Sequence, residues 1–140
     1  MKRVFDLLAA VGLLAILGLP LLAVATVLRL KQGRGVVFSQ QRVGRYGQPF
    51  EILKFRTMRP QQPGDPAITA GESDLRVTAI GAVLRRFRID EWPQLWNVVK
   101  GEMSMVGPRP EVPEFVDMSD STWPLILQVR PGITGPDALA

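Results

Sequence analysis

Leu7 to Leu28 reads LLAAVGLLAILGLPLLAVATVL, a run of 22 residues without a charged side chain. A straight helix of that length is roughly 33 Å long, which matches a bilayer hydrocarbon core of about 30 Å. On hydropathy alone, a single-pass transmembrane helix therefore stays a valid interpretation. A cleaved signal peptide is disfavoured, because the run is long for one and basic residues follow it at once. The segment is predicted to lie in a membrane.

A break in the middle of this run suggests a different membrane topology. Pro20 has no N–H and cannot donate to the carbonyl of Ile16. A break there leaves two helical pieces of about 22 and 15 Å, and neither spans the hydrocarbon core alone. Lys and Arg flank both ends of the run, which suits two cytoplasmic ends. These features favour a re-entrant helix-break-helix over residues 1–34, with the membrane break at Leu19 and Pro20. Because proline kinks are also common in spanning helices, a crossing helix stays open on these features alone.

Composition excludes several kinds of chemistry. The 140 residues suit one domain, and 46% hydrophobic with 21% charged residues is typical of a chain that folds. Cysteine and histidine are absent, so disulfides, zinc sites built from those residues, thiol nucleophiles and imidazole-based triads are excluded. Any catalysis must use carboxylates, Lys, Arg, hydroxyls or a hard metal ion.

The net charge of +4 lies in the N-terminal segment. Residues 1–34 hold five basic residues and one acidic residue, whereas residues 35–140 hold twelve of each. A basic stretch beside an apolar run suits a membrane surface. Because the remainder of the chain is neutral, no nucleic-acid partner is predicted.

The rest of the chain is predicted to be a small mixed domain. Residues 36–42 and 50–58 have the pattern of two strands around a turn at 46–49, which makes a short β-hairpin. Residues 59–74 carry three prolines and two glycines and are predicted to be a loop. Apolar spacing predicts an amphipathic helix over 78–88.

A second helix is predicted to start at Asp90, a favoured N-cap, and to end at Gly101. The fold class is therefore α+β: a membrane helix-break-helix, a short β-hairpin and amphipathic helices on the surface.

The Asp90-Glu91 pair is the strongest candidate for chemistry. An N-cap Asp followed by a helix-favouring Glu would give the same pattern and stays open as an alternative. Cations precede the pair: Arg85, Arg86 and Arg88 lie just before it, and Lys54 and Arg56 lie on the preceding predicted strand. Such cations suit a phosphate-bearing substrate. A pair of carboxylates could also hold a Mg²⁺ ion beside those phosphates. A carboxylate can also attack phosphorus to form an acyl phosphate, without an imidazole.

Arg109 is the next candidate. Pro108 and Pro110 restrict the chain around it, so its guanidinium loses little entropy on binding an anion. A structural turn with a solvated arginine is the alternative. The glycines form no P-loop or GxGxxG pattern, so no nucleotide fold of those types is assigned.

Several blocks together resemble one family, the monotopic phosphoglycosyl transferases, also called bacterial sugar transferases. The matching blocks are FDLL at 5–8, FSQQRVG at 38–44, FEILKFRTM at 50–58, RIDEWPQLWNVVKGEMSMVGPRP at 88–110 and PGITG at 131–135. The resemblance covers nearly the whole chain, in the order found in the family.

The resemblance implies an enzyme that moves a phosphosugar from a UDP-sugar to a polyprenol phosphate, undecaprenyl phosphate, and releases UMP. Asp90 matches the nucleophile that forms a covalent aspartyl-phosphosugar intermediate, and Glu91 matches the residue associated with Mg²⁺, beside Asp90. Positions Lys54, Arg56, Arg85 and Arg109 match basic residues that bind phosphates or the nucleotide, and Arg88 completes the predicted set.

The resemblance also implies a location and two parts. Residues 1–34 would be the re-entrant segment and residues 35–140 the catalytic domain, on the cytoplasmic face of the bacterial inner membrane. The reaction would be the first membrane step of glycoconjugate synthesis, and a homo-oligomer is compatible with it.

Two departures keep alternatives open. Leu19 stands where the family usually has Ser, and the sequence ends five residues after the last block, where relatives normally continue. The alternatives are a single-pass membrane-anchored binding module and a catalytically silent, shortened homologue.

Overall fold

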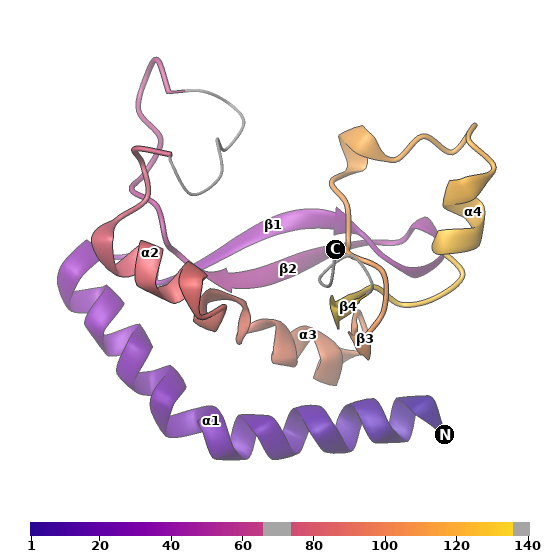
Figure 1. The fold of residues 1–140 in the computed structure, drawn as a ribbon, viewed down its shortest axis with the longest axis horizontal. Helices are drawn as coiled ribbons and strands as arrows, with labels where there is room; N and C mark the ends of the chain where they lie inside the picture. Colours follow the sequence, from indigo (N-terminus) through magenta and orange to yellow (C-terminus); the bar gives the residue numbers. More distant parts are fainter. Residues whose placement is uncertain (66–73, 136–140) are drawn as a thin grey trace.

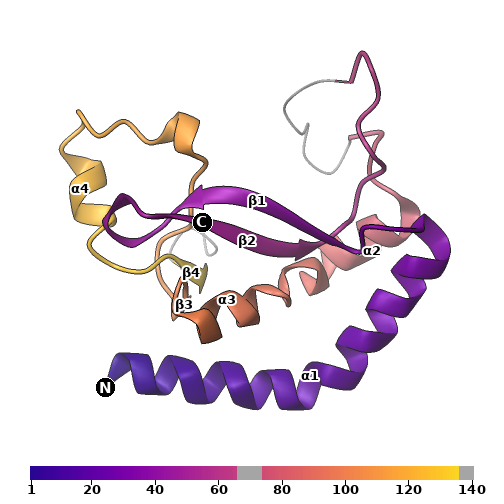
Figure 2. The same ribbon diagram turned by 180° about the vertical axis from the view of Figure 1, so that it is seen from behind.

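The computed structural model describes residues 1–65 and 74–135, and it is a mixed α and β structure (Figures 1 and 2). The helices are α1 (Lys2–Gln32), α2 (Ala79–Arg86), α3 (Gln94–Lys100) and α4 (Thr122–Ile126). The strands are β1 (Val37–Val43), β2 (Pro49–Phe55), β3 (Ser104–Val106) and β4 (Gly132–Thr134). Short 3-10 turns occur at η1 (Arg45–Gly47), η3 (Ile89–Glu91) and η4 (Pro113–Phe115).

Helix α1 is one continuous helix of 31 residues, with Pro20 inside it. It changes direction part-way along its length in both views (Figures 1 and 2). A proline removes one backbone hydrogen bond and is a common cause of such a bend, so the predicted break is a bend within a helix rather than a gap between two. The most apolar window of α1 has a mean hydropathy of 2.7 and is 6% buried, so by length and composition the helix could cross a membrane.

Both parts of α1 pack against the rest of the chain. One core cluster consists of Ala10, Phe50, Ile52, Leu95, Val98 and Met103, and a second consists of Leu28, Phe55 and Leu84. Ala10 lies in the first third of α1 and Leu28 near its end, so the bent helix follows the surface of the domain. Its outer face is apolar and exposed, for example at Ile16 (74% exposed) and Leu19 (81%).

The predicted hairpin is confirmed. Strands β1 and β2 are antiparallel, from Val37 opposite Phe55 to Val43 opposite Pro49. The hairpin, the α2–α3 pair and α1 form three successive layers in both views (Figures 1 and 2). Part of the predicted loop at 59–74, residues 66–73, lies outside the described residues.

Helix α2 agrees with the predicted helix over 78–88. The Thr78 hydroxyl caps it by accepting a hydrogen bond from the Gly81 N–H at 3.0 Å. Gly81 packs directly on the backbone of Thr57, where a Cβ atom would overlap the carbonyl group. Helix α2 is therefore held against the chain that leaves β2.

The prediction that the second helix starts at Asp90 is wrong. Asp90 lies in η3, and α3 begins at Gln94. The turn closes with i to i+3 hydrogen bonds, such as the one from the Trp92 N–H to the Ile89 carbonyl (3.2 Å). Pro93 has no N–H and cannot donate an α-helical hydrogen bond to the residue four positions earlier, in the turn. Helix α3 therefore starts after Pro93. The predicted end is confirmed, because Gly101 caps α3 with φ of 95°.

Candidate active site

Asp90 and Glu91 lie in a tight turn between α2 and α3. Arg88, just before them, has a left-handed backbone (φ 54°, ψ 24°). A non-glycine residue pays on the order of 1 kcal/mol or more for this conformation, and such strain tends to occur at functional sites. The strained residue follows α2 and directly precedes the 3-10 turn that carries the two carboxylates.

The pKa of Asp90 is raised above its ordinary value. Burial of the half-buried side chain is the largest cause, and the charge of Glu91 raises the pKa further. The charges of Lys54 and Arg85 act in the opposite direction and lower it. Asp90 is thus a carboxylate that is poorly solvated but lies within the field of cations.

Glu91 is held by two cations. Its Oε1 lies 3.0 Å from Lys54 Nζ, and its Oε2 lies 3.8 Å from Arg88 Nη1. The Lys54 and Glu91 side chains are 23% and 20% exposed, so their attraction is screened less than at an open surface. The contact links strand β2 to the turn that carries Asp90.

An open pocket lies beside this turn, and its lining is strongly basic. The charged lining residues are Arg42, Lys54, Arg88, Glu91 and Arg109. The rest of the lining is Ile52, Gln94, Gly107, Pro110, Gly132, Ile133, Thr134 and Gly135. Four cations against one carboxylate favour an anionic ligand, and guanidinium groups suit phosphate oxygens in particular.

Arg109 reaches the pocket through a close crossing of two chain segments. The Gly107 N–H donates to the Thr134 carbonyl and the Gly132 N–H donates to the Pro108 carbonyl, both at 2.9 Å. A Cβ atom at Gly132 would overlap the backbone of Gly107. Glycine is therefore required for this approach, which fixes the loop that carries Arg109.

Two of the predicted phosphate-binding residues lie outside the pocket lining. Arg56 donates from Nη1 to the Arg34 carbonyl at 3.3 Å, and its guanidinium covers Gly35. Arg85 donates from Nε to the Thr57 hydroxyl at 2.9 Å. Arg85 still acts on the site, because its charge lowers the pKa of Asp90.

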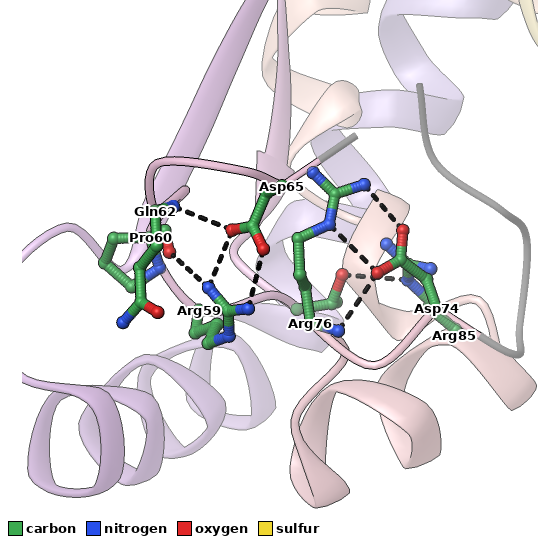
Figure 3. A network of polar contacts seen from close by, with 8 residues as sticks. Arg59, Pro60, Gln62, Asp65, Asp74, Arg76 and Arg85 are labelled. Atoms are coloured by element: carbon green, nitrogen blue, oxygen red, sulfur yellow. Dashed lines mark hydrogen bonds and ion pairs between the residues drawn. The ribbon is translucent and has the colours of Figure 1, made fainter. Parts of the chain in front are cut away.

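Arg85 lies beside a polar network on the same side of the molecule (Figure 3). Arg76 Nη2 lies 2.6 Å from Asp74 Oδ2, and Arg59 Nη1 lies 2.8 Å from Asp65 Oδ2. The Arg76 and Asp74 side chains are 8% and 4% exposed. This network supports the chain on either side of residues 66–73, near α2.

The family model described as bacterial sugar transferase matches residues 1–139. This chain belongs to the bacterial sugar transferase family. Its resemblance to that family, inferred from the motifs, is thereby confirmed.

Three relatives illustrate the range of this family of transferases. The chain is 44% identical to an Aeromonas hydrophila UDP-N-acetylgalactosamine-undecaprenyl-phosphate N-acetylgalactosaminephosphotransferase, with 96% of the chain and 32% of the relative covered. It is 42% identical to a Caulobacter vibrioides UDP-glucose:undecaprenyl-phosphate glucose-1-phosphate transferase, with coverages of 96% and 51%. It is 35% identical to an Erwinia amylovora UDP-galactose-lipid carrier transferase, with coverages of 96% and 31%.

The chain spans between about a third and two thirds of the length of its curated relatives. The three relatives are named for three different sugars, so family membership does not indicate a particular sugar for this chain.

Arg42 is a pocket residue of this chain that the sequence did not single out. It donates from Nη1 to the Pro110 carbonyl at 3.1 Å and from Nη2 to Gln40 Oε1 at 2.7 Å. Its buried Nε has no partner among the described residues. Burial lowers the pKa of Arg42, Glu111 partly offsets this, and the nearby positive charge of Arg109 lowers it further. A basic residue near a strand end is common and predicts no function by itself. The one sequence signal for Arg42 was its place in the FSQQRVG block at 38–44, which resembles the family.

Proposed function

We propose that this chain is a phosphoglycosyl transferase that moves a phosphosugar from a UDP-sugar to undecaprenyl phosphate and releases UMP. The observation that carries the proposal is the raised pKa of Asp90 in a turn whose neighbour, Glu91, lines a pocket with four cations. Relatives named as undecaprenyl-phosphate transferases support the same reaction class.

The first step forms a covalent intermediate. A carboxylate oxygen of Asp90 attacks the phosphorus that carries the sugar, and the bond from that phosphorus to the bridging diphosphate oxygen breaks. UMP leaves with the oxygen and the electron pair. Because burial destabilises the ionised Asp90, its carboxylate is more basic and more nucleophilic than a solvated one. Arg42, Lys54 and Arg109 would neutralise the phosphate charge, which is the main requirement of phosphoryl transfer.

The second step returns the enzyme to its starting form. A phosphate oxygen of undecaprenyl phosphate attacks the same phosphorus, and the acyl-phosphate bond breaks. Its electron pair returns to the Asp90 carboxylate, and the product is the diphosphate-linked lipid sugar. One carboxylate therefore serves as both nucleophile and leaving group.

Mg²⁺ is part of the proposal. Among residues 1–65 and 74–135, no group of three or more acidic side chains could hold a metal by itself. Mg²⁺ commonly binds one or two carboxylates together with substrate phosphates, so Asp90 and Glu91 fit this mode of binding. When bound, Mg²⁺ would neutralise charge on the diphosphate.

Contacts at both ends of α1 support the proposed membrane arrangement. Arg3 donates to the Val98 carbonyl at 2.7 Å, and Gln32 donates to the Thr78 hydroxyl at 3.0 Å. Two ends held by one domain support a re-entrant segment, since a straight crossing would separate them. We therefore assign residues 1–34 to the bacterial inner membrane and residues 35–140 to a catalytic domain on its cytoplasmic face.

A single-pass anchored binding module and a silent homologue are not favoured. A binding module does not account for the strained turn at Arg88 beside a basic pocket. A silent homologue would keep both features, so the assay of UMP release separates it from the proposed enzyme. Both would give no Mg²⁺-dependent release of nucleotide.

The test is UMP release by the full chain in lipid nanodiscs, with a panel of UDP-sugars, Mg²⁺ and undecaprenyl phosphate. We expect release with at least one UDP-sugar and a loss of about 10³-fold or more in Asp90→Asn. Glu51→Gln is the matched control, because it changes an exposed carboxylate of β2 away from the pocket lining. Without acceptor, peptide mass spectrometry should detect the phosphosugar adduct on Asp90.

Unfolding is controlled by thermal melts. Asp90→Asn removes a carboxylate whose ionised form is disfavoured by burial, so its Tm should not fall. Activity that survives in this variant would contradict the assigned nucleophile, and silence with every UDP-sugar would contradict the transferase.

A further inference from the structure

A second cavity, of about 270 Å³, lies at the N-terminal end of α1. Its charged and polar lining includes Lys2, Arg3, Asp6, Arg45, Ser104 and Arg130. It shares no lining residue with the pocket beside Glu91. The proposed transfer reaction gives it no role.

The single carboxylate of this cavity is already neutralised. Asp6 is 3% exposed and accepts hydrogen bonds from the Ser104 hydroxyl (2.9 Å) and the Met105 N–H (3.1 Å). Lys2 Nζ lies 3.5 Å from its Oδ2 and also contacts the Ser104 hydroxyl. Asp6 and Lys2 thus form an ion pair, and no carboxylate of the cavity lining is left to balance the charge of its other cations.

Arg45 and Arg130 are oriented by main-chain carbonyls rather than by carboxylates. Arg45 Nε donates to the Gln128 carbonyl at 2.8 Å, and Arg130 Nε donates to the Gly101 carbonyl at 2.7 Å. Within the described part of the chain, their terminal nitrogens donate no hydrogen bond and no carboxylate lies within 4 Å of them. A carbonyl fixes a guanidinium without cancelling its charge, so both groups can still bind an anion.

Arg3 adds a third such cation. It donates to the Val98 and Val99 carbonyls at the end of α3, at 2.7 and 3.1 Å. This contact satisfies carbonyls of the last turn of α3, where a cation is favoured by the helix dipole. After Asp6 and Lys2 neutralise each other, three guanidinium groups with fixed positions remain in the cavity lining.

The cavity lies where the apolar face of α1 begins. Val4, Phe5 and Leu8 are 60%, 64% and 70% exposed on the same turns of the helix. If α1 is inserted as in the proposed function, acyl chains cover these side chains, and the cavity lies at the level of the phosphate layer.

We propose that this cavity binds the phosphate of an anionic phospholipid headgroup. The phosphate oxygens would accept hydrogen bonds from Arg45 and Arg130, and the acyl chains would lie along the exposed face of Phe5 and Leu8. The bound lipid would join the start of α1 to the segment around Arg130. The cavity is thus a lipid site separate from the catalytic pocket.

The experiment measures binding of short-chain phosphatidylglycerol, phosphatidylcholine and inorganic phosphate to the full chain in neutral detergent, by native mass spectrometry. We expect phosphatidylglycerol to bind at least about 10-fold more tightly than phosphatidylcholine, which has the phosphate but no net charge. The double variant Arg45→Gln/Arg130→Gln should lose about 10-fold or more in phosphatidylglycerol affinity.

Arg29→Gln/Lys31→Gln is the matched control, because it removes two cations near the other end of the membrane helix. It should change the affinity less than about twofold if the cavity, rather than net charge, binds the lipid. Arg45→Lys/Arg130→Lys keeps the charges and should retain part of the affinity, which separates lost binding from lost folding.

Equal affinity for the two lipids would overturn the proposal, as would equal losses in the two Gln double variants. Inorganic phosphate binding as tightly as phosphatidylglycerol, with the same arginine dependence, would assign the site to a free anion instead. The readout needs no turnover, so an inactive transferase would leave this result unaffected.

Discussion

Lys54 Nζ lies 3.0 Å from Glu91 Oε1, and this contact joins strand β2 to the turn that holds Asp90. Lys54 also lowers the pKa of Asp90, whereas Glu91 raises it. The two partners of one ion pair therefore act on the same carboxylate in opposite directions. Their substitution should move its titration in opposite directions as well.

Replacing Lys54 should shift the acidic limb of the pH–rate profile to higher pH. The folded pKa of Asp90 is already raised, and the proposed attack needs the ionised form, so activity should fall as the pH drops through this pKa. Lys54→Gln removes a charge that lowers the pKa, so the loss begins at a higher pH. We also expect kcat/KM above this limb to fall about 10²-fold, because a pocket cation is lost. Lys100→Gln, whose lysine pairs with Glu102, should leave the profile unchanged.

Replacing Glu91 should shift the same limb to lower pH. Glu91→Gln removes a negative charge that raises the pKa of Asp90, so the carboxylate stays ionised in more acidic solution. The variant should also need more Mg²⁺, since one of two proposed carboxylate ligands is gone. Profiles measured at saturating Mg²⁺ separate the two effects. A shift in the same direction as in Lys54→Gln would contradict the assigned electrostatics.

Asn97→Ala should destabilise the domain by about 2–4 kcal/mol. Asn97 is fully buried and donates from Nδ2 to the Glu51 carbonyl and to Glu102 Oε2, both at 2.7 Å. Its Oδ1 accepts from the Leu53 N–H at 3.1 Å. Alanine removes the partner of the Glu51 carbonyl and of the Leu53 N–H, whereas Glu102 keeps its contact with Lys100. Thermal melts followed by circular dichroism test this prediction, with the exposed Gln41→Ala on β1 as a control that should not change the Tm.

Cysteine labelling should place both ends of α1 on one side of the membrane. The chain contains no cysteine, so Lys2→Cys and Arg34→Cys each give a single reactive site. In sealed vesicles of one orientation, an impermeant maleimide should label both variants from the same side. Ala10→Cys, at a position with 0% exposure, should react only after denaturation. Labelling of the two ends from opposite sides would establish a straight crossing.

Local sequence patterns were sufficient for the elements formed by near neighbours. Alternating residues around a glycine-containing turn predicted the β1–β2 hairpin, and apolar spacing predicted α2. Gly101 marked the end of α3, because a left-handed cap needs no long-range contact. The start of α3 was mispredicted because Asp90 is a good N-cap by type, whereas the backbone at Arg88 and Pro93 makes a separate 3-10 turn.

The sequence by itself determined the apolar segment, its proline, the Asp90-Glu91 pair and the family. Only the tertiary structure decided which cations share a pocket with Glu91, next to Asp90, which is not itself a lining residue. Arg42, Lys54, Glu91 and Arg109 come from separate segments, and packing of the hairpin on α3, together with the glycine crossing of β3 and β4, brings them to one pocket. The same packing leaves Arg56 outside the lining, although it is two residues from Lys54. Spacing along the chain fixes local backbone geometry, whereas long-range packing fixes which side chains share one space.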